Sequence, residues 1–170
     1  PFKWLTGPMS HPTIEQRIAP RATTSWIFRG MAVNTKATIS APTNLSIERV
    51  ESKNFDEFLN VFLSGWGFLS KEDRERAVKK AEIITDPKSV FTYYIAKIDD
   101  VPIGSAGYVL KDSYAYLVGG NVLEKYRGRG AYRALVKRRL DDLYEAGFKL
   151  AVTQAREATS VPILAKLGFD

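Results

Sequence analysis

The spacing of hydrophobic residues changes once in the second half of the chain, from strand-like to helical. Residues 114–123 form an apolar segment rich in aromatic and β-branched side chains, which is typical of a strand. From Ala131 onward the apolar residues recur at helical spacing, which predicts a helix that ends at Gly147. A turn rich in arginine and glycine joins the two elements. We expect the buried face of the helix to consist of Tyr132, Val136, Leu140, Leu143 and Tyr144.

The same patterns predict the elements before and after this unit. Asn54 is expected to cap a helix, and Ser64–Gly67 to interrupt the chain before a second, highly charged helix. Glycines within the strand patterns, at 104, 107, 119 and 120, suggest bulges or close approach of the backbone to a ligand. The predicted segments are a strand at 45–50, helices at 55–63 and 71–84, a hairpin of strands at 90–98 and 103–110, a strand at 149–154 and a short helix within 161–169.

The N-terminal part of the chain has a weaker pattern. A short helix is predicted at 13–19, a β-rich segment at 23–33 predicts a strand, and 34–44 has the composition of a linker. We therefore expect residues 1–43 to be an appendage, or the tail of a preceding half-domain, and residues 44–170 to be the main domain.

Composition narrows the class of protein without choosing a function. With 170 residues and 45% hydrophobic content, the chain is long enough for one domain with a real core. Its net charge of +6 favours acidic partners, which include nucleic acids, membrane surfaces and phosphorylated cofactors. The absence of cysteine excludes disulfides and thiol catalysis, no apolar run is long enough to span a membrane, and no ligand spacing suits zinc. We expect a soluble, cytoplasmic protein without a metal.

The loop between the central strand and helix is suited to a polyanion. Gly128 and Gly130 permit unusual backbone conformations and close approach of a ligand. The loop also leads into a helix N-terminus, where unpaired N–H groups and the helix dipole favour phosphate oxygens. The basic residues around it are Lys125, Arg127, Arg129, Arg133, Lys137, Arg138 and Arg139, with no acidic residue after Glu124 until Asp141.

The glycine spacing distinguishes between the known phosphate loops. A Walker loop would need Lys and then Ser or Thr directly after Gly130, and a dinucleotide fingerprint would need a glycine at Arg133. The segment Arg127-Gly-Arg-Gly-Ala-Tyr132 instead resembles the Arg/Gln-x-x-Gly-x-Gly/Ala signature of the GNAT superfamily of acyl-CoA-dependent N-acyltransferases, except that Tyr132 replaces a small residue. The order of the surrounding elements is similar to that family over about residues 44–170.

The resemblance implies an α/β (α+β) fold with a mixed, mostly antiparallel sheet that is flanked by helices and splayed at the CoA site. It also implies acetyl-CoA as cosubstrate, with backbone N–H groups of the loop on the pyrophosphate and those of the preceding strand end on the pantetheine. The residues expected to bind the cofactor are Val122, Leu123, Arg127, Gly128, Arg129, Gly130, Ala131, Tyr132 and Arg133.

Catalytic and acceptor-binding residues are less well defined. An amine that is protonated at neutral pH benefits from a base, and Glu124 and Asn121 are the candidates, with Glu157 farther away. The family commonly has a tyrosine where Leu164 stands and an asparagine where Thr159 stands, so the usual general acid is missing. Trp66 and Phe68 are candidate acceptor contacts; packing in the core or in a lid is the competing interpretation.

These features support an N-acetyltransferase that transfers the acetyl group to a primary amine by direct attack in a ternary complex. The acceptor would be a small molecule or an exposed amino group of a peptide, and a homodimer remains open. The alternatives are a catalytically silent CoA-binding module and, less favoured, nucleic-acid binding through the basic helix of 129–139.

The resemblance also raises the question of a missing strand. The chain ends at Asp170, whereas the family continues with a strand after Leu-Gly-Phe. Because an uncovered apolar sheet edge invites pairing, we predict that residues 23–33 lie beside 149–154 and close the sheet, while the linker crosses the surface.

Overall fold

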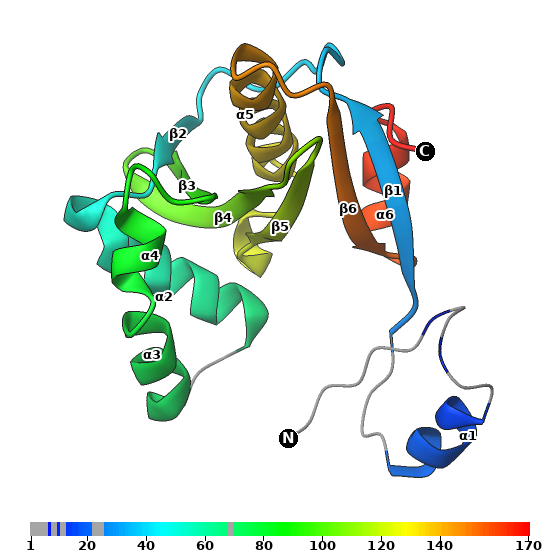
Figure 1. The fold of residues 1–170 in the computed structure, drawn as a ribbon. Helices are drawn as coiled ribbons and strands as arrows, with labels where there is room; N and C mark the ends of the chain where they lie inside the picture. The colour runs from blue at the N-terminus through cyan, green and yellow to red at the C-terminus, as the bar shows by residue number, and fades with distance from the viewer. Residues whose placement is uncertain (1–6, 8–9, 11–12, 22–25, 68–69) are drawn as a thin grey trace.

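The chain folds around a six-stranded mixed sheet (Figure 1). The structure, a computed structural model, describes residues 7, 10, 13–21, 26–67 and 70–170. The sheet order is β1-β6-β5-β4-β3-β2, and only β5 and β6 run parallel to each other. The strands are β1 (Phe28–Asn34), β2 (Ser46–Arg49), β3 (Phe91–Ile98), β4 (Val101–Leu110), β5 (Ala115–Val122) and β6 (Leu150–Arg156).

Helices cover both faces of the sheet. In β3, Tyr94 and Ala96 face the core that contains α5, while Ile95 faces the core of α2, as the alternation of side chains along a strand requires. Figure 1 shows α5 on one side of β3–β5 and α2 with α3 and α4 on the other. The helices are α1 (Ile14–Ile18), α2 (Phe55–Trp66), α3 (Lys71–Val78), α4 (Ala81–Thr85), α5 (Ala131–Glu145) and α6 (Ser160–Ala165). Short 3-10 turns are η1 (Ala19–Arg21), η2 (Ser52–Asn54) and η3 (Glu124–Tyr126).

The predicted pairing of the N-terminal strand is confirmed. β1 lies antiparallel to β6, from Phe28 opposite Arg156 to Asn34 opposite Leu150, and Figure 1 shows the two strands side by side. The backbones of Ala32 and Asp170 also exchange two hydrogen bonds, of 2.7 and 3.0 Å. Residues 28–34 thus form the edge strand of the sheet, whichever domain boundary is drawn in the chain.

The sheet splays between β5 and β6, as the family resemblance implies. The two strands pair only at Ala115–Ala151 and Tyr116–Val152. Beyond Tyr116, the register of β4 and β5 shifts, because Gly119 and Gly120 of β5 lie opposite the single residue Ala106. Such a bulge bends the strand that contains it, and it occurs at the predicted glycine pair, where β5 leaves β6.

Two local predictions about α2 to α4 are wrong, and the predicted cap at Asn54 is right in position only. Helix α2 continues through residues 64–66 and ends at Gly67 in the left-handed conformation, so the interruption comes later than predicted. The charged helix predicted at 71–84 is divided into α3 and α4, and Val78, whose place in the apolar stripe predicted burial, is exposed. Asn54 occupies the N-cap position of α2, but its side chain bonds the backbone of Arg49 and Glu51 instead of the helix N-terminus.

The buried face of α5 is rotated from the predicted one. Val136, Leu140 and Leu143 are buried as expected, but Tyr144 is exposed. The face is centred nearer to Leu135 and includes a charged residue; its members are Ala131, Ala134, Leu135, Val136, Arg139, Leu140 and Leu143. The helix ends as predicted, with Gly147 in the left-handed region.

Candidate active site

A cavity of about 760 Å³ occupies the gap where β5 and β6 diverge. Its walls are residues 116–122 of β5 and the side chains of Thr153, Gln154 and Arg156 on β6. The end of α2, the first half of α5, the start of α6 and the segment before β1 complete the lining. The aromatic residues of the lining are Trp26, Phe28, Trp66, Tyr116 and Tyr132.

The predicted phosphate loop lies next to this cavity and has free backbone donors. Gly128 and Gly130 have φ angles of 78° and 83°, in the left-handed region that glycine favours. The first bond of α5 is donated by Ala134 to the carbonyl of Gly130. Within the part of the chain that the structure describes, the N–H groups from Gly128 to Arg133 therefore have no backbone acceptor. Such a row of donors at the start of a 15-residue helix is suited to anionic oxygens.

The two loop glycines differ in their surroundings. A Cβ at Gly128 would meet open space, whereas a Cβ at Gly130 would lie 2.5 Å from the Cγ of Pro42. The linker predicted at 34–44 therefore packs against the back of the loop. Gly130 is needed for packing as well as for its φ angle, and Gly128 is the better position at which to test ligand binding alone.

At the end of β5, only one of the two predicted amides is available. The N–H of Leu123 donates to the carbonyl of Ile103 on β4 at 2.8 Å, so it is not free for a ligand. Successive N–H groups of an antiparallel strand point to opposite sides, and that of Val122 therefore points away from β4, toward the gap with β6. The backbones of β4 and β5 are also close here. Gly104 lies opposite Val122, and a Cβ on Gly104 would be only 2.8 Å from the carbonyl oxygen of Asn121.

Asn121 and Trp66, two residues of the cavity lining, each have a buried polar atom without a partner in the described chain, and that of Asn121, Oδ1, packs against Gly65 of α2. Asn121 is more than nine-tenths buried, and its Nδ2 donates to Ser105 Oγ at 2.9 Å. Among the described residues, neither its Oδ1 nor the Nε1 of Trp66 has a hydrogen-bond partner, although both atoms are buried. Burying a polar atom without a partner is costly. One acceptor and one donor thus remain unsatisfied in the wall of the cavity.

The cations that follow the loop fall into two sets. We call Arg127, Arg129 and Arg133 the outer cations: all three are exposed and none forms an ion pair within the described chain. Arg127 Nε donates to the carbonyl of Val122 at 3.3 Å. Arg129 lies 5.6 Å from the ring centre of Tyr126. We call Lys137, Arg138 and Arg139 the inner cations, and each of these is bonded to other parts of the protein.

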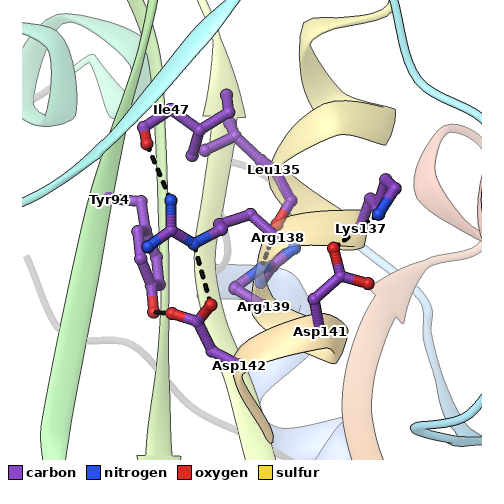
Figure 2. Close-up of polar contacts among 8 residues, drawn as sticks. All are labelled: Ile47, Tyr94, Leu135, Lys137, Arg138, Arg139, Asp141 and Asp142. Carbon is purple, nitrogen blue, oxygen red and sulfur yellow. Dashed lines mark hydrogen bonds and ion pairs between the residues drawn. The ribbon is translucent and has the colours of Figure 1, made fainter. Parts of the chain in front are cut away.

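Figure 2 shows how the inner cations are held. Lys137 and Arg138 pair with Asp141 and Asp142 one turn later, at 2.5 and 2.8 Å. Tyr94 donates from β3 to Asp142, and burial together with that bond raises the pKa of Tyr94. Arg138 also donates to the carbonyl of Ile47. This network joins α5 to two strands, so it explains these charges without a ligand.

Arg139 was not foreseen as a cavity residue. It is 2% exposed and donates to the carbonyls of Leu135 and Gly107, at 2.9 and 3.1 Å. The described residues provide no carboxylate for it, and burial lowers the pKa of its guanidinium. The helical period could have revealed it, because Arg139 lies one turn after Leu135.

The other predicted residues are only partly brought together. Tyr132 lines the cavity and packs on Gly120, where a Cβ would lie 3.0 Å from its ring. Trp66 lines it too, whereas Phe68 lies outside the described residues. Glu124 is exposed and is not part of the lining, so its catalytic role stays a prediction. Glu157 forms an ion pair with Arg29 at the surface, which accounts for its charge.

Leu164 and Thr159 both line the cavity, so the usual position of a tyrosine acid is filled by an apolar side chain. The hydroxyl groups that remain there belong to Tyr116, Tyr132, Thr153, Thr159 and Ser160. Burial raises the pKa of Tyr116, which keeps its phenol protonated at neutral pH. Sequence reasoning had no means of finding Tyr116, because only the splay of β5 from β6 exposes it to the cavity.

No group of three or more potential metal ligands occurs among the residues that can be described. A helix with the length and apolar character of a membrane span is also missing from that part of the chain.

Comparison with known proteins agrees with this architecture. The model of the acetyltransferase (GNAT) family matches residues 53–169. No curated protein matches the sequence. A conserved protein of unknown function from Staphylococcus epidermidis superposes with a TM-score of 0.74 at 14% identity, over 95% of this chain and 64% of that one. The chain thus spans less than two thirds of that protein.

Two further solved structures have the same fold. The aminoglycoside N-acetyltransferase AAC(6′)-Iy, bound to a bisubstrate analogue of CoA, has a TM-score of 0.64 at 16% identity, over 75% of this chain and 92% of its own. A GCN5-related N-acetyltransferase from Sphaerobacter thermophilus has a TM-score of 0.64 at 16% identity, over 95% of this chain and 54% of its own. At these identities the superpositions establish the fold, and the family model establishes membership. The chain belongs to the GNAT acetyltransferase family.

Proposed function

We propose that this protein transfers an acetyl group from acetyl-CoA to a primary amine by direct attack within a ternary complex. The observation that carries the proposal is the splay of β5 from β6 beside a loop whose N–H groups from Gly128 to Arg133 lack acceptors. The gap between β5 and β6 can admit the extended pantetheine chain, and the loop can bind the phosphates of the cosubstrate. The bisubstrate analogue of CoA bound by AAC(6′)-Iy, a protein of the same fold, supports the same cosubstrate here.

Different residues bind different parts of the cosubstrate. The loop amides and the outer cations bind the pyrophosphate and the adenosine phosphate. The N–H of Val122 faces the pantetheine, as in the pairing of an added strand, whereas the N–H of Leu123 is bonded to Ile103 and binds no ligand. Ala131 is buried and Tyr132 lies over Gly120. These two residues therefore shape the space for the cosubstrate and do not bind its phosphates.

Acetyl transfer then needs a neutral amine and a proton for the leaving group. The amine nitrogen attacks the thioester carbonyl carbon, the tetrahedral intermediate loses its C–S bond, and the CoA thiolate takes up a proton while the new amide nitrogen releases one. Asn121 can orient the amine or a water molecule through its unpaired Oδ1. Tyr116 or Tyr132 can donate the proton that Leu164 cannot.

Calorimetric titration with acetyl-CoA tests the proposal. In Gly128→Glu the new carboxylate would lie in the open space of the loop and repel phosphate, so we expect binding to be lost. Gly147→Glu is the matched control, because Gly147 also has open space around it and a left-handed φ of 85°, and it lies at the end of α5 outside the cavity lining. Equal affinity of the two variants would refute the role of the loop.

A catalytically silent CoA-binding module is the second candidate, favoured by Leu164 and Thr159 in the cavity wall. Release of CoA thiol in the presence of a panel of amines separates the two functions. Any amine-dependent release supports the enzyme, whereas tight acetyl-CoA binding without release supports the silent module. The fold does not favour nucleic-acid binding through α5, because the inner cations are already paired or buried.

A further inference from the structure

The charged residues that line the cavity are all cationic. Three guanidinium groups line it, those of Arg127, Arg139 and Arg156, while none of its lining residues is Asp or Glu. Arg127 lies on the phosphate loop and serves the cosubstrate in the function proposed above. Arg139 already donates to the carbonyls of Leu135 and Gly107. Arg156 lies away from the loop, and its charge calls for a different anion.

Arg156 is at the mouth of the cavity on the side of α2. Its neighbour Ala155 belongs to the core with α5 and α6, and alternation along β6 places Arg156 on the opposite face of the sheet. The phosphate loop precedes α5, so it lies on the other face. Arg156 is therefore on the side from which an acceptor, and not the phosphates of the cosubstrate, would approach.

Two indole rings flank Arg156, and no acid pairs with it in the part of the chain that the structure describes. Its guanidinium carbon lies 4.3 Å from the ring centre of Trp26 and 5.8 Å from that of Trp66. No carboxylate pairs with it in the described ranges, and the adjacent Glu157 is bonded to Arg29. A guanidinium that stacks on aromatic faces keeps its in-plane N–H groups for a carboxylate.

The unpaired atoms of the wall complete a complementary set. Trp66, which contacts Arg156, has an unsatisfied donor at Nε1, and Asn121, deeper on β5, has an unsatisfied acceptor at Oδ1. A ligand with a carboxylate at the mouth and an amine farther in would match the donors and the acceptor in that order. The surrounding cations would also disfavour an ammonium ion, which helps to keep the attacking amine neutral.

We propose that the acceptor is a small amino acid-like molecule whose carboxylate binds Arg156 between Trp26 and Trp66 while its primary amine faces Asn121. This deepens the proposed function and rests on it. It separates this protein from the aminoglycoside acetyltransferases of the same fold, because a polycationic acceptor would meet only like charges in the described wall.

Matched acceptor pairs test the proposal. Each pair differs only in the carboxylate: phenylalanine and phenethylamine, leucine and isoamylamine, alanine and ethylamine, with kanamycin as a polycation. We expect kcat/KM for at least one amino acid to exceed that of its decarboxylated partner by about tenfold or more, in keeping with loss of a charge-assisted bond. A preference for the decarboxylated member in every pair, or for kanamycin, would overturn it.

Arg156→Gln assigns the preference to this residue. We expect the variant to lose the preference for the carboxylate while its affinity for acetyl-CoA is unchanged, and the latter also shows that it is folded. Arg29→Gln is the control, because Arg29 is on the neighbouring strand but pairs with Glu157 outside the cavity. An Arg156→Gln variant that retains the full preference would contradict the assignment.

A binding measurement separates this inference from the function on which it rests. Quenching or enhancement of the intrinsic tryptophan fluorescence by phenylalanine, compared with phenethylamine, reports occupancy near Trp26 and Trp66 without turnover. If no amine releases CoA but phenylalanine still binds more tightly, the proposed reaction fails and the carboxylate site stands. If CoA is released and phenethylamine binds as well as phenylalanine, the reaction stands and the carboxylate site fails.

Discussion

The outer and inner cations are neighbours in the sequence but serve different purposes in the molecule. Arg127, Arg129 and Arg133 are exposed without acidic partners in the described chain, whereas Lys137 and Arg138 are paired one helical turn later with Asp141 and Asp142 (Figure 2). A cluster of positive charge in a sequence therefore indicates a ligand only where the fold leaves it without acidic partners. In this chain the outer cations end in the first turn of α5, and the inner cations begin in its second turn.

The largest expected effect comes from the loop that presents the outer cations. In Gly130→Ala, the left-handed φ of 83° and the approach of Cβ to 2.5 Å from Pro42 both oppose the substitution. We expect a loss of about 3 kcal/mol in the free energy of unfolding. Urea denaturation measures it, with Gly128→Ala as the control, since that position shares the strain but not the contact; equal losses would show that Pro42 does not constrain the loop.

Next in size is the network of the inner cations. Asp142→Ala leaves Arg138 and Tyr94 without their shared acceptor in a partly buried position, so we expect a loss of about 2 kcal/mol. Asp141→Ala removes the more exposed pair with Lys137 and should cost about 0.5 kcal/mol. Both should bind acetyl-CoA like the wild type. A weakened affinity in Asp142→Ala, measured under fully folded conditions, would mean that the inner network also shapes the site.

Replacing the outer cations should weaken the affinity for acetyl-CoA and leave the free energy of unfolding almost unchanged. Replacing Arg127, Arg129 and Arg133 together with Gln is expected to raise the Kd for acetyl-CoA about tenfold, or about 1.4 kcal/mol, and to change the free energy of unfolding by less than about 0.5 kcal/mol. A charge-matched control replaces Lys71, Lys79 and Lys80 with Gln. Titration at low and high salt should show that only the first variant has a reduced salt dependence; a similar effect of both would indicate attraction by net charge alone.

The smallest effect concerns a third kind of cation, on β3. Lys97 lies 3.0 Å from Glu48 and 2.7 Å from Glu57, and its hydrogen bond lowers the pKa of Glu48. Both carboxylates are more than a third exposed, so at neutral pH we expect Lys97→Met to cost only about 1 kcal/mol.

This cost should depend on pH with a definite sign. Because the hydrogen bond from Lys97 holds the folded-state pKa of Glu48 below its usual value of 4.5, the contribution of the pair is present above that pH and is lost as the pH falls through the lowered value. The difference in unfolding free energy between wild type and Lys97→Met should therefore shrink below about pH 4.5. A difference that grows on acidification would contradict this assignment of the ion pairs.

The comparison also separates what pattern reasoning can and cannot find. Helical periodicity identified α5 and its end at Gly147, but it left Arg139 out of the buried face and included Tyr144, which is exposed. The error has one cause, since the buried face was assigned from side-chain polarity instead of from the neighbours that the helix meets. Arg139 is buried because the carbonyls of Leu135 and Gly107 accept its N–H groups.

The sequence by itself determined the loop, the irregular backbone at the glycine pair, the order of elements and the partner of the edge strand, which was predicted at 23–33 and lies at 28–34. These depend on local backbone preferences and on residues close in the chain, or on an apolar edge that needs a partner. Only the tertiary structure decided which cations are free and which polar atoms lack partners, because both depend on groups from distant segments. Arg156 meets Trp26 and Trp66 only after β1 pairs with β6 and α2 ends beside them.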